Sequence, residues 1–409
     1  MKINLIIVFS MMISLSTNCV ADTIPDLNDI RNKLIKMGYE NVSADFTNDT
    51  LYLCYENRVY RWEAIAMAEI TKQTMLQLAD NKILCLICLK RGIPIISGII
   101  NKAIYQQYIK GEISKDEFSR TVHVSYGLYP FKKGAGRNPS FNKFDLVVHP
   151  QIHAQFGNYS DPLESQVNVA PALNISLWPG MNLTAQVIIP LQNDLEKAGD
   201  YVRPGLLTLN QTIRLPFNIF TTGTAGYFTR NRYGIDLETR KFTNNGKFSL
   251  GIRCGCTGEA SVVDGRWTYT EADLLTWFAD ASYRYAGYDL TVKAGYGRFI
   301  DKDKGWRFDV YRQFGEISIG FYAIRSGDVL NGGFNFSVPL PPRRYSTRHF
   351  IRIRPAGSFS WEYRGKGLPG EGKIYATENG INEYSNSLNP DYIKKLIVNR
   401  LATKIKIMN

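Results

Sequence analysis

Residues 144–156 alternate between polar and apolar side chains with almost no interruption. Asp145, His149 and His153 fall in one series of alternate positions, and Ile152 and Phe156 fall in the other. A period of two over this length is that of a β-strand with one polar and one apolar face. The pattern recurs as far as about residue 363, so we expect a large sheet whose two faces meet different surroundings.

The N-terminus has the features of a secretory signal at residues 1–21. Lys2 precedes an apolar stretch at residues 5–13, and Cys19, Val20 and Ala21 offer a small-residue cleavage site. An alternative is that Cys19 becomes a lipidated N-terminus. In both cases we expect export, which argues against a nucleic-acid partner despite the formal net charge of +12.

After this signal, no apolar run approaches the ~20 residues that a membrane-spanning helix needs. The best candidate, residues 83–100, is interrupted by Lys90, Arg91, Gly92 and Pro94. The mean hydropathy of -0.21 excludes a helical membrane protein but suits a barrel, because alternating faces average out. We therefore expect a mainly β protein, an antiparallel outer-membrane β-barrel of about 12 strands with lipid outside and water inside.

A soluble β-sandwich is the competing fold, because its strands alternate too. In a sandwich, Arg214, Lys293 and Asp309 would point into a dry core, where unpaired charge is costly. Connections also differ in length: Pro179 and Gly180 form a tight turn, and longer polar loops are expected at residues 193–203 and 257–270. Short turns at one end and long loops at the other are typical of outer-membrane barrels.

Changes in composition and hydropathy pattern along the chain predict five segments. They are a signal peptide (1–21), a small periplasmic α/β domain (22–120), a linker (121–141), the transmembrane β-barrel (142–365), and a Gly-rich segment with a helical basic tail (366–409). In the α/β domain, Asp26 is a candidate cap for a helix that ends at Gly38. Strands are expected at 42–46 and 51–56, a helix within 61–79, and strands at 83–89 and 93–100.

The cysteines offer little chemistry. Cys85 and Cys88 are three residues apart in a predicted strand, which sends their side chains to opposite faces. Cys254 and Cys256 share a face at a spacing that is poor for a direct disulfide. We expect small buried residues, one chance disulfide at most, and neither a metal site nor a cofactor.

The best candidate for catalysis is the series Asp145, His149 and His153. Positions four apart on a strand are separated by ~13 Å, so these side chains cannot hydrogen-bond to one another. No G-x-S-x-G or paired-carboxylate motif is present. We expect polar side chains that line a water-filled lumen rather than a catalytic triad. The candidate lumen-facing residues are Asp145, His149, His153, Arg214, Arg253, Arg284, Lys293 and Arg307.

Part of the chain resembles the YjbH family of outer-membrane proteins linked to exopolysaccharide and group 4 capsule production. The matching residues include Gly297-Arg298-Phe299, Asp303-Lys304-Gly305, Arg312-Gln313-Phe314-Gly315 and the run from Gly333 to Leu340, with weaker matches near residues 232–251. The resemblance covers roughly residues 140–345. It implies a barrel without established catalytic residues that works with periplasmic and outer-membrane parts of a polysaccharide secretion system.

Three functions follow as hypotheses. The first is a non-enzymatic barrel that assists exopolysaccharide or capsule secretion, its positive lumen residues guiding an anionic glycan. The second is an outer-membrane enzyme that modifies lipid or glycan through His149 and His153. The third is a structural barrel whose N-terminal domain docks a periplasmic partner. In each, outer-membrane lipid surrounds the barrel.

Overall fold

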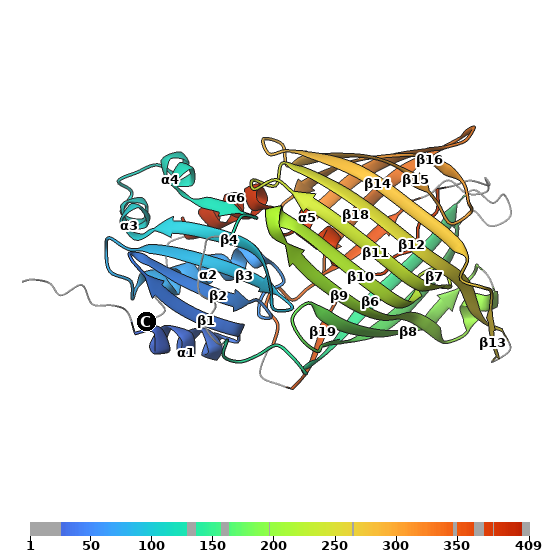
Figure 1. Cartoon of the computed structure of the whole chain (residues 1–409), viewed down its shortest axis with the longest axis horizontal. Coiled ribbons are helices and arrows are strands. Elements are labelled where there is room, and N and C mark those ends of the chain that lie inside the picture. The colour runs from blue at the N-terminus through green and yellow to red at the C-terminus, as the bar shows by residue number, and fades with distance from the viewer. Residues whose placement is uncertain are drawn as a thin grey trace, which may run out of the picture.

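The computed structural model describes residues 26–128, 136–156, 163–195, 197–263, 266–346, 350–363, 372–378 and 380–402. A small α/β domain and a large curved sheet lie end to end (Figure 1). The predicted signal peptide and the glycine-rich residues 366–371 lie outside the described residues. No helix in the ranges given above is both long enough and apolar enough to cross a membrane.

The N-terminal domain contains a five-stranded sheet in the order β1-β2-β3-β4-β5, in which β2 and β3 are parallel. Its elements are α1 (Leu27–Met37), β1 (Glu40–Thr47), β2 (Thr50–Glu56), α2 (Glu63–Met75), β3 (Ile83–Lys90), β4 (Ile93–Asn101), α3 (Lys102–Lys110), α4 (Lys115–Thr121) and β5 (His123–Ser125). The predicted helices and strands are all present. The fifth strand lies in the range that the sequence predicted to be a linker.

Local sequence explains where α1 begins and ends. The Asp26 side chain accepts a hydrogen bond from the backbone N–H of Asn28 at 2.8 Å. Gly38 closes the helix with a φ of 101°, a left-handed conformation that glycine adopts without steric cost. Ile30 and Leu34, four residues apart, are its buried side chains.

The large sheet is an almost unbroken antiparallel ladder in chain order. Its strands are β6 (Phe144–Phe156), β7 (Leu163–Ser176), β8 (Met181–Asn193), β9 (Arg203–Leu215), β10 (Ile219–Phe228), β11 (Arg232–Phe242), β12 (Phe248–Val263), β13 (Arg266–Tyr269), β14 (Leu274–Tyr285), β15 (Leu290–Arg298), β16 (Lys304–Phe314), β17 (Ile317–Ser326), β18 (Val329–Pro339), β19 (Ile351–Pro355) and β20 (Ser358–Glu362). The described sheet has fifteen strands, against the twelve or so that were expected, because it contains the short strands β13, β19 and β20 beside the long strands β6–β12 and β14–β18. The range 257–270 was predicted to be a polar loop, but residues 257–263 extend β12, and the end of this strand pairs with β13.

The two edges of the sheet are β19 and β20, which are consecutive in the chain. Strand β19 pairs in parallel with β6, and β20 pairs antiparallel with β18. Between them, Ala356 donates its N–H to Val148 O at 2.9 Å, and Gly357 O accepts from Leu340 N at 3.1 Å. No ladder joins β19 to β20 in the described part of the chain. Because β19 pairs with β6 and β20 pairs with β18, residues 351–362 nevertheless bring the first and last long strands of the sheet close together.

The two faces of the sheet differ as the alternation predicted. Large apolar side chains stand exposed on the outer face: Leu237 is 52% exposed, Leu250 61% and Phe321 66%. On the inner face, Asn210 and Thr222 are fully buried. The outer apolar face covers strand after strand, because every second residue of each strand points the same way.

The C-terminal part of the chain returns to the N-terminal domain. After residues 372–378 come α5 (Ile381–Asn386) and α6 (Pro390–Leu401). The red end of the ribbon in Figure 1 lies between the sheet and the N-terminal domain. Ile393, Ile397, Val398 and Leu401 are at most 1% exposed and belong to the apolar core of that domain. Two distant parts of the sequence therefore share one core.

Candidate functional site

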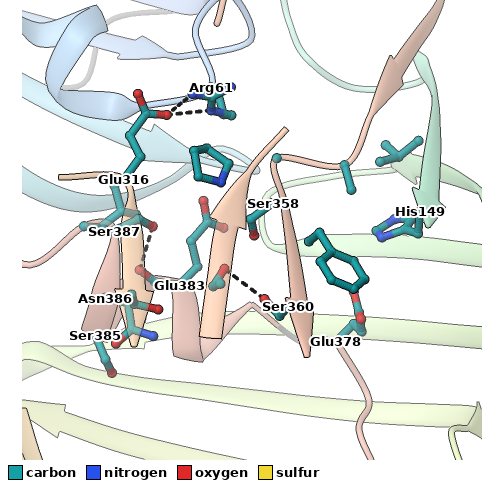
Figure 2. Close-up of a pocket in the computed structure, with 18 of the residues that line it drawn as sticks. Arg61, His149, Glu316, Ser358, Ser360, Glu378, Glu383, Ser385, Asn386 and Ser387 are labelled. Atoms are coloured by element: carbon teal, nitrogen blue, oxygen red, sulfur yellow. Dashed lines mark hydrogen bonds and ion pairs between the residues drawn. The ribbon is translucent and has the colours of Figure 1, made fainter. Parts of the chain in front are cut away.

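A cavity of about 1160 Å³ lies inside the curved sheet, and we call it the lumen cavity. Side chains from β6–β9, β11, β12 and β14–β20 form its wall, and residues 57–63 with Lys90 and Arg91 of the N-terminal domain form its floor. In Figure 2, His149, Ser358 and Ser360 lie around this space from the strands, and Asn386 and Ser387 from α5 and its end. The cavity is therefore built from three parts of the chain.

The lining of the lumen cavity is charged but nearly neutral. It contains ten Lys or Arg side chains and nine Asp or Glu side chains. Several of these charges are paired with an opposite charge on the same strand or on a neighbouring strand, and opposite charges across neighbouring strands stabilise a sheet. Arg253 lies 2.9 Å from Asp236, Lys293 lies 3.4 Å from Asp280, and Arg307 lies 2.8 Å from Asp309.

Five of the eight predicted lumen residues line the cavity: Asp145, His149, Arg253, Lys293 and Arg307. The other three lie elsewhere. His153 is exposed, so alternation alone did not bring it to the site. Arg214 and Arg284 turn toward the N-terminal domain and the C-terminal helix instead of the lumen cavity.

Arg214 binds the N-terminal domain. Its guanidinium donates to the carbonyl oxygens of Pro94 and Ile95 at 2.9 Å each, and to the carbonyl of Tyr126. Arg284 is 2% exposed; it pairs with Asp289 at 3.3 Å and lies over the Tyr392 ring of α6 at 5.2 Å. Both cations hold the two parts of the molecule together. A pattern within one strand carries no information about such docking.

Asp145 belongs to a buried ionic network at the junction between the domains. Arg352 of β19 lies 2.7 Å from Asp145 and 2.6 Å from Glu40. Arg58 lies 3.2 Å from Asp145 and 2.8 Å from Glu56. We call Glu40, Glu56, Arg58, Asp145 and Arg352 the junction network. Buried charges are tolerated in this setting because each one meets an opposite charge.

The charge states in the junction network follow from these contacts. Burial by itself raises the pKa of Glu56, but the attraction of Arg58 and hydrogen bonds from Gly92 and Asn41 lower the pKa below its usual value. Burial lowers the pKa of Arg58, yet Glu56, Asp145 and Glu40 together raise it further. Glu56 and Arg58 are therefore both charged at neutral pH.

The C-terminal segment supplies site residues that the sequence did not suggest. Tyr375 is 3% exposed and donates its hydroxyl to Asp236 at 2.8 Å, while Arg253 donates to the carbonyl oxygen of Tyr375 at 3.1 Å. Glu383 lies 2.7 Å from Lys90. The one available signal was the spacing of Ile393, Ile397 and Leu401, which indicates a helix with an apolar face that packs onto something.

The arrangement does not assemble a triad from the predicted residues. In the described residues no hydrogen bond joins Asp145, His149 and His153, and Asp145 is occupied by Arg58 and Arg352. No group of three or more His, Cys, Asp or Glu side chains in the same ranges is placed to hold a metal ion. Cys85 and Cys88 face opposite sides of β3, as predicted, in two separate apolar clusters.

These features define a mainly β protein in which a small N-terminal α/β domain covers one end of a large sheet with a polar interior. The chain belongs to the YjbH family, described as "Exopolysaccharide biosynthesis protein YbjH", whose sequence model matches residues 21–336. The predicted resemblance is confirmed, and the match reaches further toward the N-terminus than the motifs at residues 140–345 suggested. It therefore includes the N-terminal domain.

Two further comparisons were made. No curated protein matches the chain. Among solved structures, the chain is similar to OmpTdeltaL8, a loop L8 deletion mutant of OmpT, an outer membrane protein of Vibrio cholerae. The identity is 8%, the TM-score is 0.26, and the match covers 47% of this chain and 85% of that one.

Proposed function

We propose that this protein is a non-enzymatic outer-membrane β-barrel that assists exopolysaccharide or capsule secretion, with its N-terminal domain in the periplasm. Membership of the exopolysaccharide biosynthesis family supports the pathway. The observation that carries the membrane location is the outer apolar face of the sheet. A soluble monomer rarely exposes apolar patches larger than a few hundred Å², because their contact with water is unfavourable.

The lengths of the connections support the orientation. The N-terminal domain lies at the end where the strands join through tight turns, such as residues 177–180 and 315–316. At the opposite end, β12 and β13 form an extended hairpin, and residues 194–202 connect β8 to β9. Outer-membrane barrels keep short turns on the periplasmic side and longer loops outside.

The chemistry of the lumen cavity supports a glycan as the transported polymer. Paired charges alternate there with the hydroxyl and amide groups of Ser, Thr, Asn and Gln side chains. Such groups both donate and accept hydrogen bonds, as sugar hydroxyls do. Because ten cations face nine carboxylates, electrostatic guidance of a strongly anionic polymer is not favoured. We therefore propose that the transported polymer is a polyhydroxylated chain of low net charge, which periplasmic secretion components deliver to the barrel.

A substitution in the outer face tests the membrane location. Leu237→Arg lies in the middle of β11, and an arginine facing lipid near the bilayer midplane costs about 2–4 kcal/mol. Tyr201→Arg is the matched control, because Tyr201 is 71% exposed in a connection between strands. We expect Leu237→Arg to lower the amount of folded protein in outer-membrane fractions and Tyr201→Arg to leave it unchanged. Equal tolerance of both changes would contradict the membrane location.

Secreted polysaccharide tests the pathway. Deletion of the gene should lower extracellular polysaccharide, and expression of the wild-type chain should restore it. The control is total intracellular polysaccharide, which distinguishes a defect in secretion from a defect in synthesis. Unchanged extracellular polymer after the deletion would contradict the proposed role.

A further inference from the structure

The N-terminal domain contacts the near end of the curved sheet at several points of its rim. On one side, Gly180 of the turn between β7 and β8 donates its N–H to Arg91 O at 2.7 Å. Next along the sheet, Arg214 of β9 donates to Pro94 O. The N–H of Tyr126 then donates to Asn244 O, in the turn between β11 and β12, at 2.9 Å.

The contacts continue on the other side of the rim. Arg61 forms an ion pair with Glu316, in the turn between β16 and β17, and Figure 2 shows this pair beside the lumen cavity. The N–H of Arg61 also donates to Arg343 O, after β18, at 3.0 Å. At β6 and β19, the junction network completes the circuit. The N-terminal domain therefore covers this end of the sheet, which we call the near mouth.

The N-terminal domain shares one apolar core with α5 and α6. Ile381, Leu388 and the apolar side of α6 lie in the same core as β1–β4 and α2. Trp62 packs edge-on against Tyr392 of α6, with ring centroids 5.7 Å apart. We call residues 26–128 with α5 and α6 the lid. A shared apolar core makes separation of α6 from the rest of the lid costly.

The interface between the lid and the rim has a different character. Many of its contacts are ion pairs and hydrogen bonds to turn carbonyls. The apolar part is formed by Phe220 and Phe242 of the sheet, which pack against Tyr126 and Tyr384 of the lid and share its core. Interfaces that are more polar than a core resemble those of transient complexes, and relative motion of the two parts is the default expectation for them. Outside this apolar contact, the boundary between lid and sheet consists of ion pairs and hydrogen bonds.

We infer that the lid is a gate, and that the structure is its closed state. Polymer can enter the lumen cavity from the near mouth once the rim contacts break, while residues 372–378 keep the lid attached to the inner wall. The inference rests on the proposed function, since it concerns the regulation of the same lumen. Arg61 and Glu316 act as a latch at the turn between β16 and β17.

Conductance through planar lipid bilayers tests the gate with the purified full chain. The double variant Arg61→Ala/Glu316→Ala removes the latch. Lys110→Ala/Glu112→Ala is the matched control, because it removes an exposed ion pair within the lid. We expect low conductance for the wild type and the control, and several-fold higher conductance for the latch variant.

A reversible disulfide between the lid and the segment after β18 gives a second test. It compares the oxidised and reduced forms of one variant, so a difference in folding between variants does not affect the result. Tyr60 of the lid and Arg344 form an isolated antiparallel bridge, a pairing that places Cα atoms about 4.5–5.5 Å apart, within disulfide range. In the latch variant, Tyr60→Cys/Arg344→Cys should give low conductance when oxidised and high conductance after reduction. Failure of this disulfide to form, as seen by gel mobility, would count against the docked lid.

The remaining outcomes separate the two proposals. A wild type that conducts as well as the latch variant, or a disulfide that forms without changing conductance, overturns the gate and leaves the barrel standing. Absence of conductance from every variant, together with tolerance of Leu237→Arg, overturns the proposed function itself.

Discussion

The Tyr375 hydroxyl donates a hydrogen bond to the Asp236 carboxylate at 2.8 Å, which joins the C-terminal segment to the inner face of β11. Arg253 adds a second bond to this segment, and its guanidinium carbon lies 4.6 Å from the centre of the Tyr375 ring. The Phe228 ring stacks on the Tyr375 ring, with centroids 5.3 Å apart. One aromatic side chain therefore fixes the path of the chain between the far end of the sheet and the lid.

The variant Tyr375→Phe should loosen this attachment. It removes a hydrogen bond to a charged acceptor, which is worth about 1.5–3 kcal/mol, and leaves the ring in place. Denaturant unfolding in detergent measures the loss. Tyr201→Phe, at an exposed position, is the control and should change stability by no more than about 0.5 kcal/mol. Equal effects from the two variants would show that Tyr375 does not anchor the segment.

The variant Ile397→Ala should destabilise the lid. Ile397 is 1% exposed in a core built from both ends of the chain, and truncation of such a residue costs about 2–5 kcal/mol. Leu76→Ala, at a side chain that is 68% exposed, should have little effect. Limited proteolysis of the N-terminal domain gives a direct comparison. If Ile397→Ala leaves the proteolysis rate of that domain unchanged, α6 is not part of its core.

Acid should weaken the junction network at Glu56. The pKa of Glu56 is held below its ordinary value of 4.5, so the carboxylate contributes stability that is fully present above that pH. The contribution disappears as the pH falls through the lowered pKa, because the protonated acid no longer attracts Arg58. The difference in unfolding free energy between wild type and Glu56→Gln should therefore shrink between neutral pH and about pH 3. A difference that stays constant over this range would refute the assignment.

The double variant His149→Ala/His153→Ala distinguishes the barrel from an enzyme. A non-enzymatic barrel should secrete polysaccharide at near the wild-type level, because neither imidazole has a hydrogen-bonded acid partner in the described part of the chain. A catalytic role predicts loss of function with normal amounts of protein in the membrane. Extracellular polysaccharide, normalised to the amount of folded barrel, is the measurement.

Much of the local structure could be predicted from the sequence. The alternation at β6 identified its two faces, and the cap at Asp26 with Gly38 gave both ends of α1. The position of Asp145 and His149 in the lining also followed from alternation. By contrast, Arg214 and Arg284 lie on the inner face of their strands and yet bind the lid. Both residues lie at the rim of the sheet, where an inward-pointing side chain meets the lid instead of water.

The sequence alone determined most of the long strands of the large sheet, which face of each is apolar, and the family to which the chain belongs. These properties depend on neighbouring residues and fixed periods, so they can be read locally. Only the tertiary structure decided that Arg352 meets Glu40, 312 positions away, and that α6 completes the N-terminal core. Such contacts depend on how distant segments pack in space, and no local period encodes which partner a buried charge or an apolar helix face will find.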